Sequence, residues 1–437
     1  SYFSGAGMWK GNQPNGGFRA YDWASYRAVR LEFDFGGLKP SIFPELRAKS
    51  WNMKTTRTIL IIVAAVVALS YITGHGYIWG GLVETYARGW NNSNIDDIEF
   101  RDLRTIAAAE NPSPWVAKKS WNMEFTEEEM AWHDEYMSAS FLVLHGDTLL
   151  FEEYWQGHDH TTLTNSFSAC KSIVALALGL AVSDGKVNVQ NELADYLPRF
   201  AGDGGRGLTV QEALQMRSHI PFGEDYANPF GFMAKAYYRG DIQGLLEPYR
   251  VEETPGSEWK YEGGNTMLLG ELIAGLDEGS LSQWVETRLW NPMGAQHDAF
   301  WGLDAPDEEG GIERCFAAYY ATSRDYARFG KLINHQGNWN GKQLIDSTYM
   351  AEMLTPIAAM SDECDAEHYG YQIWLGETDS GMPFSCMEGL RGQMVISVPL
   401  LDLVVVRTGY KKDKRKEGPL PSDIRRVLNM ALRLLEQ

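Results

Sequence analysis

An uncharged apolar run at residues 58–83 constrains this chain more than any other feature. The run "TILIIVAAVVALSYITGHGYIWGGLV" contains no Lys, Arg, Asp or Glu. Roughly 20 apolar residues in a helix cross a bilayer, so we expect a transmembrane helix at 58–83. Tyr71, Tyr77 and Trp79 are of the type that lies at a membrane interface. A buried core helix is one alternative, and a signal peptide that begins at Met53 is another, although 52 residues precede it.

The charge of the chain changes sign across this run. Residues 1–57 hold nine Lys and Arg against four Asp and Glu, a net charge of +5, and the rest carries −24 of the total of −19. Because positive charge marks the cytoplasmic side of a membrane helix, we expect a cytoplasmic arm at 1–57. The chain would then cross the bacterial inner membrane once and place the remainder in the periplasm. An acidic body repels phosphates, which argues against nucleic acid as a partner.

The sequence beyond the apolar run predicts a linker and one folded domain. Residues 84–125 combine a short helical pattern with the break "NPSPW", so we expect a linker there. In 126–437, apolar runs near residues 139–154 and again near residue 400 favour strands, and the segments between them favour helices. Strands at both ends with helices between them predict an α/β (α+β) domain. Its antiparallel sheet would be closed by pairing of the two ends.

A buried lysine at the start of an apolar helix is the first candidate for chemistry. Lys171 is the only charged residue between Ser168 and Asp184. Positions three apart share a helix face, so Ser168 and Lys171 would point into one cleft. A serine hydroxyl needs a base, and a lysine serves as one if burial and nearby positive charge lower its pKa. The alternative is a serine cap followed by an incidental lysine that reaches solvent.

Two later segments add groups that such a site needs. Tyr261 follows a Pro-Gly turn and precedes an apolar helix. A phenol near an ammonium can have a depressed pKa and relay protons. Gly389 and Gly392 lie where a strand begins, and glycine there allows a close approach of backbone to substrate. The backbone N–H of Leu390, paired with that of Ser168, would form an oxyanion hole.

Serine, lysine, tyrosine and a Gly-containing strand in this order resemble the penicillin-recognising serine hydrolases, over roughly residues 130–437. That superfamily includes AmpC-type β-lactamases, D,D-peptidases, family VIII esterases and 6-aminohexanoate-oligomer hydrolases. The block "GLRGQ" followed by "VVVRTG" is most similar to the 6-aminohexanoate-oligomer hydrolase and esterase branch. The resemblance implies a β-lactamase/transpeptidase-like fold, with an antiparallel sheet flanked by helices and a helical subdomain. One transmembrane helix would precede it, and no metal or organic cofactor is expected.

The resemblance also implies roles for individual residues. Ser168 would be the acylated nucleophile and Lys171 its general base. Tyr261 would pass a proton to the leaving group. The backbone N–H groups of Ser168 and Leu390 would form the oxyanion hole.

Four further residues are expected to bind substrate: Gly389, Arg391, Gly392 and Asn265. Here the chain departs from the family pattern, because Met387-Glu388-Gly389 stands where β-lactamases and D,D-peptidases carry Lys-Thr-Gly. The cation that receives a substrate carboxylate is therefore missing, unless Arg391 substitutes for it. Asn265 stands four residues after Tyr261, whereas AmpC-type enzymes have Tyr-x-Asn.

The sequence thus predicts a membrane-anchored serine hydrolase that cleaves a small-molecule ester or amide through a Ser168 acyl-enzyme. Its partners would be the lipid bilayer and other membrane subunits that bind residues 1–83. One alternative is a structural subunit of a membrane complex that uses a hydrolase-like domain as a scaffold. Another is a D,D-peptidase or β-lactamase. Spacing predicts no zinc site, since no C-x-x-C occurs, and leaves open a Cys364–Cys386 disulfide.

Overall fold

The computed structural model describes residues 53–118, 123–277, 279–358, 368–413, 416–417 and 420–436. The expected arm at 1–57 lies almost wholly outside the described residues, as does Cys364. The chain divides into two compact units, residues 1–62 and 63–437, and the second holds every element after helix α1 (Met53–Ile72).

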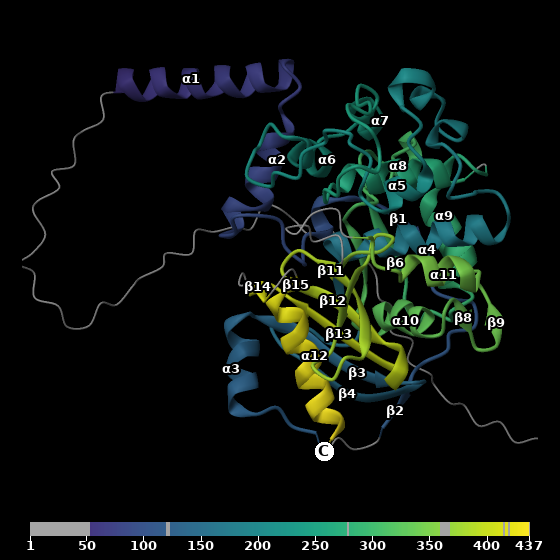
Figure 1. The fold of residues 1–437 in the computed structure, drawn as a ribbon. Helices are drawn as coiled ribbons and strands as arrows, with labels where there is room; N and C mark the ends of the chain where they lie inside the picture. Colours follow the sequence, from purple (N-terminus) through teal and green to yellow (C-terminus); the bar gives the residue numbers. More distant parts are fainter. Residues whose placement is uncertain are drawn as a thin grey trace, which may run out of the picture. The chain divides into compact units, whose positions relative to one another are not determined.

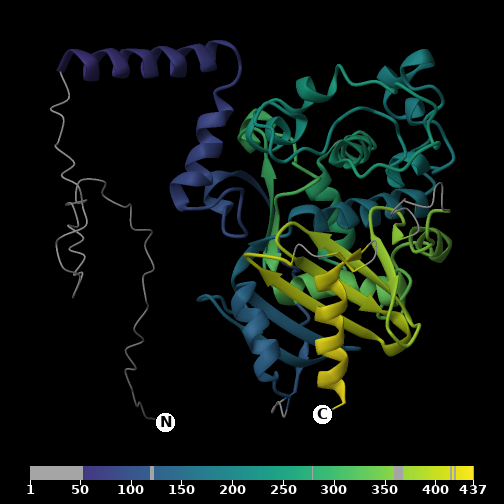
Figure 2. The same ribbon diagram turned by 60° about the vertical axis from the view of Figure 1, so that its left-hand side comes forward.

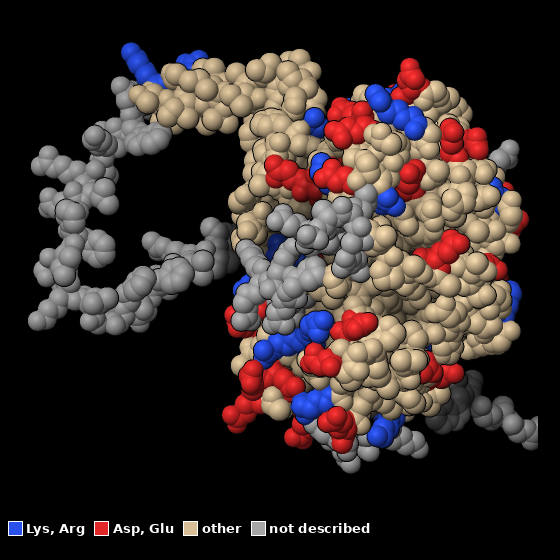
Figure 3. Space-filling view, in the orientation of Figure 1, with Lys and Arg blue, Asp and Glu red and all other residues tan. Residues whose placement is uncertain are grey.

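The apolar run forms two helices, so the prediction of one helix at 58–83 is wrong at both ends. Helix α1 spans Met53–Ile72 and helix α2 spans Tyr77–Glu84. Gly74, with φ of +75°, breaks the run in a left-handed conformation that a residue with a side chain rarely adopts. Lys54–Ile72 is the one helix in the described part long and apolar enough to cross a membrane. Its charged residues lie at its N-terminal end (Figure 3).

The main sheet pairs the two ends of the domain, as predicted (Figure 1). Its seven strands run in the order β10-β11-β12-β13-β3-β4-β2, and all neighbours are antiparallel except β2 and β4. The strands are β2 (Val116–Ala117), β3 (Ser138–His145), β4 (Thr148–Tyr154), β10 (Trp374–Glu377), β11 (Pro383–Gly389), β12 (Gln393–Val398) and β13 (Leu403–Gly409). The β3–β4 turn lies at Gly146, within residues 139–154, where the sequence favoured strands.

Successive side chains along a strand point to opposite faces of the sheet, and they pack into two core layers. Phe141 and Val143 of β3 pack with α12 (Ser422–Leu435) on one face of the sheet. Leu142 and Leu144 pack on the other face with the core that includes α10 (Ser323–Asn334) and α4 (Cys170–Ser183). Figure 2 shows α12 on one side of the sheet. Helix α4 is apolar all round because it is buried all round, which is the reason its sequence shows no polar face.

Residues 84–118 are part of the domain, and the prediction of a linker there is wrong. Strand β1 (Asp102–Ile106) pairs with β6 (Ala299–Leu303) in a second sheet, whose order is β1-β6-β7-β5. The other strands of this sheet are β5 (Leu163–Asn165) and β7 (Tyr319–Thr322). Ile95 and Ile106 are fully buried in the main core. A linker would not bury such side chains.

A helical subdomain is formed by residues that lie between β5 and β6 in the sequence. It contains α5 (Val210–Leu214), α6 (Phe232–Tyr238), α7 (Ile242–Leu246), α8 (Gly263–Ala274) and α9 (Leu281–Val285). The remaining helices are α3 (Glu127–Glu135) and α11 (Ser347–Met353), and two further hairpins pair β8 (Asn338–Trp339) with β9 (Lys342–Gln343) and β14 (Lys416–Glu417) with β15 (Leu420–Pro421). The fold expected from the resemblance is confirmed.

Candidate active site

Ser168 lies in a tight turn between strand β5 and helix α4. The turn is a 3₁₀ helix, Phe167–Ala169, and the α-helix begins two residues after the serine. Phe167 has φ of 46°, a left-handed conformation that is strained for a residue with a side chain. Its backbone N–H donates to Oδ1 of Asn165 at 2.8 Å, which helps to hold that conformation. The strained residue therefore sits next to the candidate nucleophile.

Lys171 and Ser168 are in direct contact, as the sequence predicted. The lysine Nζ donates to Ser168 Oγ at 2.8 Å and to the carbonyl oxygen of Phe316 at 3.3 Å. Lys171 is only 1% exposed. Burial lowers the pKa of the Lys171 ammonium from its usual value of 10.5, while the carboxylates of Glu224 and Glu388 act in the opposite direction. The prediction that a nearby positive charge also lowers the Lys171 pKa is thus wrong, and burial alone favours the neutral amine.

Tyr261 completes this group, but its pKa is the reverse of the prediction. The Lys171 Nζ lies 4.9 Å from the centroid of the Tyr261 ring, which stacks on Trp374. Burial raises the pKa of the Tyr261 phenol well above its usual value, Glu224 raises it further, and a hydrogen bond with Ser168 opposes them. The phenol therefore keeps its proton at neutral pH. The prediction of a depressed pKa is therefore wrong, and the protonated phenol rather than the phenolate stands at the site.

Gly389 lets strand β11 lie directly against the serine turn. A Cβ at Gly389 would be 2.1 Å from the carbonyl oxygen of Ser166, far inside contact distance. Leu390 follows and lines the same cavity as Ser168. The two residues expected to form the oxyanion hole are thus brought to one cavity. Gly392 instead faces away, since a Cβ there would lie 2.4 Å from a guanidinium nitrogen of Arg407.

The guanidinium of Arg391, which was expected to bind substrate, is hydrogen-bonded to backbone carbonyl oxygens. Its guanidinium donates to the carbonyl oxygens of Ser93 at 2.7 Å, Tyr410 at 2.8 Å and Asn92 at 2.9 Å, and lies over the ring of Trp90. All three guanidinium nitrogens are used by the fold. Arg391 therefore fixes the backbone of the segment that supplies Asn92 and Ser93 to the cavity.

Asn265 and Gly392 are not among the residues that line the cavity beside Ser168. Asn265 is buried on α8, where its Nδ2 donates to the carbonyl oxygen of Glu262 at 3.2 Å. Its position four residues after Tyr261 places it in the first turn of the helix, away from the tyrosine's own extended segment. The expected substrate contact is not supported at either residue.

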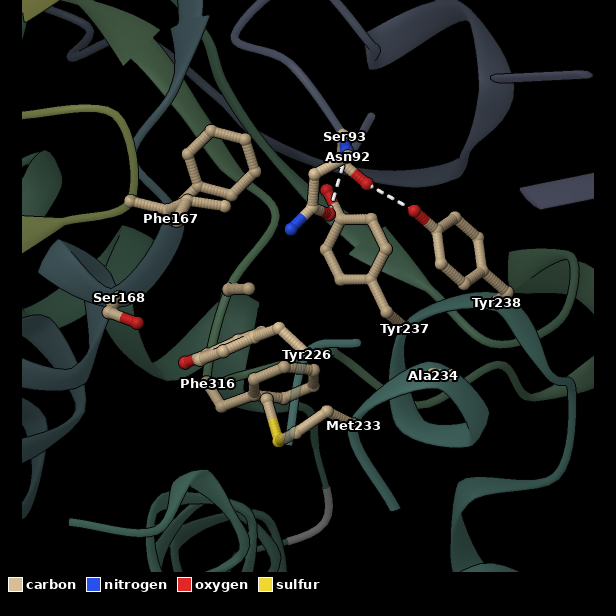
Figure 4. A pocket seen from close by; sticks show the side chains of 12 residues that line it. Asn92, Ser93, Phe167, Ser168, Tyr226, Met233, Ala234, Tyr237, Tyr238 and Phe316 are labelled. Atoms are coloured by element: carbon tan, nitrogen blue, oxygen red, sulfur yellow. Dashed lines mark hydrogen bonds between the residues drawn. The ribbon is translucent and has the colours of Figure 1, made fainter. Parts of the chain in front are cut away.

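The cavity beside Ser168 is small and largely aromatic (Figure 4). It has a volume of ≈ 60 Å³. Ser168 shares it with Asn92, Ser93, Phe167, Tyr226, Met233, Ala234, Tyr237, Tyr238, Phe316, Ala317 and Leu390. None of these described lining residues carries a charge, so the cavity suits an uncharged part of a substrate.

Of two carboxylates near the site, Glu388 was noted in the sequence and Glu224 was not. Glu224 accepts hydrogen bonds from the Gly263 backbone N–H at 2.7 Å and from the Tyr226 hydroxyl. Glu388 pairs with Lys412 at 2.6 Å, and this pairing raises the pKa of the lysine. Glu224 stands in a loop without any motif, so only its position after folding reveals it. Among the described residues, no group of three or more His, Cys, Asp or Glu is arranged to hold a metal ion.

Comparison with known proteins gives a family and a fold. Residues 126–418 match the family model described as Beta-lactamase. The 6-aminohexanoate-dimer hydrolase of Paenarthrobacter ureafaciens is 24% identical over 292 residues, which cover 63% of this chain and 73% of that protein. A provisionally named D-alanyl-D-alanine carboxypeptidase of Escherichia coli strain K12 is 29% identical over 133 residues, 28% of this chain and 30% of that protein.

Solved structures share the fold at lower identity. A provisionally named 6-aminohexanoate-dimer hydrolase from Bacillus anthracis has a TM-score of 0.62 at 19% identity, and the match covers 82% of this chain and 93% of that chain. A family VIII carboxylesterase has a TM-score of 0.55 at 17% identity, with 70% of this chain and 96% of that chain covered.

Proposed function

Because the chain belongs to the beta-lactamase family and is a serine hydrolase, we propose that it cleaves an ester or amide through an acyl-enzyme on Ser168. One observation carries this proposal. A buried lysine, whose pKa is lowered by burial, lies 2.8 Å from the Ser168 hydroxyl. A neutral amine in that place accepts the hydroxyl proton, which is what makes a serine nucleophilic.

The residues account for both halves of a double displacement. Lys171 takes the proton as Ser168 Oγ attacks the substrate carbonyl, and the N–H groups of Ser168 and Leu390 stabilise the oxyanion. Tyr261 gives its proton to the leaving alcohol or amine and recovers one from Lys171. Water then attacks the acyl-enzyme by the reverse proton path, which releases the acid and frees Ser168.

The charges near the site disfavour substrates that present a carboxylate. Glu224 and Glu388 are the acids whose fields reach Lys171, and the Arg391 guanidinium is held by backbone carbonyls. A carboxylate would be repelled by these acids and would find no free cation at Arg391. This argues for an ester or amide substrate without a carboxylate over a β-lactam or a D-Ala-D-Ala peptide.

We further propose that α1 anchors the domain in the inner membrane, with its N-terminus in the cytoplasm and the catalytic domain in the periplasm. Support comes from its length and composition and from the basic residues that precede it. Residues 1–83 would then also be available to other membrane subunits. A structural role in such an assembly is compatible with hydrolase activity.

A substrate panel tests the catalytic proposal. The purified full chain and Ser168→Ala would be compared on p-nitrophenyl esters, the 6-aminohexanoate dimer, a D-Ala-D-Ala peptide and nitrocefin. We expect hydrolysis of an ester or amide that is lost in Ser168→Ala, and little on nitrocefin or the peptide. Efficient nitrocefin or D-Ala-D-Ala hydrolysis would overturn the substrate assignment, and activity retained in Ser168→Ala would overturn the nucleophile.

A further inference from the structure

The catalytic cavity has a neighbouring cavity beside helix α2. A second cavity of ≈ 120 Å³ lies against α2, and four residues line both cavities: Asn92, Tyr226, Ala234 and Tyr238. We call this second cavity the α2 groove. Its own walls come from α2, the short 3₁₀ helix after it and the loop before α6, chiefly Gly81, Leu82, Tyr86 and Pro229. The two cavities adjoin because they share a wall.

The wall between α2 and α6 is built from specific contacts. Gly81 faces the ring of Tyr238, whose atoms would lie 3.4 Å from a Cβ at that position. The hydroxyl of Tyr238 is 2.5 Å from Ser93 Oγ, and that of Tyr77 donates to the carbonyl oxygen of Pro229 at 2.9 Å. The polar ends of these tyrosines are therefore satisfied, and their rings are left as apolar lining.

The groove opens among exposed apolar side chains. Leu82 is 38% exposed and Tyr86 65%, and both line the groove. No Asp, Glu, Lys or Arg lines either cavity in the part of the chain that the structure describes. Exposed apolar side chains at the mouth of an uncharged cavity mark a binding site for an apolar ligand.

From this geometry we infer that the acyl group of the substrate is an apolar chain that runs from Ser168 into the α2 groove. The substrate is therefore an amphiphilic, lipid-like ester or amide. This inference rests on the proposed function and adds the substrate class. It also fits the chain order, because α2 begins five residues after the apolar helix α1 ends. The mouth of the groove is thus built by the segment next to the proposed membrane anchor.

A chain-length series on the detergent-solubilised full chain tests the inference. The probes are p-nitrophenyl acetate, butyrate, hexanoate and octanoate, each below its micelle concentration. Burying one methylene in an apolar site gives at most about a 4-fold gain in kcat/KM. We expect about 2- to 4-fold per methylene over part of the series. A flat or falling profile would overturn the inference.

Two variants locate the chain in the groove. Ala234→Phe adds a ring at a position that lines both cavities and so obstructs the space between them. Gly81→Leu adds a side chain on α2 that fills the groove. Each should lower the octanoate-to-acetate ratio of kcat/KM by about 10-fold or more, whereas a folding defect would lower both rates together. Ala351→Phe, on an exposed face of α11, is the matched control and should keep the wild-type ratio. An unchanged ratio in both groove variants would contradict the inference.

Fluorophosphonate labelling in the same samples separates this inference from the proposed function. Labelling that depends on Ser168, together with a flat chain-length profile, would overturn the acyl-chain assignment and leave the proposed function standing. Absence of labelling on the folded wild-type chain would overturn both the proposed function and the acyl-chain assignment.

Discussion

At the scale of single residues, the site depends on a lysine kept in a place where its charge is costly. Lys171 is buried, and its Nζ has two oxygen partners, Ser168 Oγ and the carbonyl of Phe316. The S-x-x-K spacing was sufficient to predict that contact, because helix geometry places i and i+3 together. The state of Tyr261 was not predictable, since its phenol pKa depends on Glu224 and on burial that only the fold creates.

The first prediction concerns the pH dependence of turnover. Because burial lowers the pKa of Lys171 from 10.5, kcat/KM should rise with pH as the ammonium loses its proton, and the midpoint should lie below 10.5. Replacing Lys171 by Ala should lower kcat/KM by about 10²–10⁴-fold, the usual contribution of a general base. The remaining kcat/KM of Lys171→Ala should no longer rise with pH over this range. A wild-type profile that falls through this range would contradict a neutral-lysine base.

At the scale of elements, the close approach of β11 to the serine turn requires glycine. We predict that Gly389→Ala displaces the strand, because a Cβ would lie 2.1 Å from the Ser166 carbonyl oxygen. Such overpacking costs about 1–3 kcal/mol, and activity should fall at least about 10-fold. Chemical denaturation and ester hydrolysis measure the two effects.

Gly80→Ala is the control for this substitution, since a Cβ there meets nothing within 4 Å. Gly80 lies on an open face of α2, and its replacement should leave both stability and turnover near the wild-type values. A stable, fully active Gly389→Ala protein would refute the proposed packing.

A buried ion cluster joins the two ends of the segment at 84–101. Arg101 pairs with Glu84 at 2.5 Å and with Asp97 at 3.3 Å, and all three side chains are nearly inaccessible. Removal of one partner leaves buried carboxylates uncompensated. We therefore predict that Arg101→Met lowers the free energy of unfolding by about 3–5 kcal/mol, as measured by chemical denaturation.

The same cluster gives a pH dependence with a definite sign. Burial raises the pKa of Glu84 to about 7 from its usual 4.5, while Arg101 opposes that shift. The folded state then holds a proton that the unfolded state has lost between those two values, so this group's contribution to stability falls as pH rises from 4.5 to 7. The defect of Arg101→Met should accordingly be smaller at pH 5 than at pH 8. An equal defect at both values would contradict a buried Glu84–Arg101 pair.

The elements that the sequence indicated correctly are those with strong local patterns. Strands β3 and β4 come from the apolar runs near residues 139–154, and α4 is the apolar helix that begins near Lys171. Strand β1 was missed because "DLRTI" is short and half polar, and its partner β6 lies about 200 residues away. The carbonyl partners of Arg391 were not predictable for a related reason, because they come from distant segments.

At the scale of the whole molecule, the charge step and the apolar helix α1 predict an anchored protein. The full chain should remain in the membrane after washes with high salt or alkaline carbonate and should be released by detergent. A phosphatase reporter that is active only in the periplasm should be active at the C-terminus and inactive at the N-terminus. Release by carbonate, or the opposite reporter pattern, would contradict the proposed anchoring or its orientation.

The central claim is that Ser168 is acylated, and covalent labelling followed by mass spectrometry tests it most directly. The full chain would be treated with a fluorophosphonate, weighed intact and then mapped by peptides. One adduct located on Ser168, absent from Ser168→Ala and formed more slowly in Lys171→Ala, is the predicted result. An adduct that survives in Ser168→Ala, or a folded wild-type chain that forms none, would contradict the account.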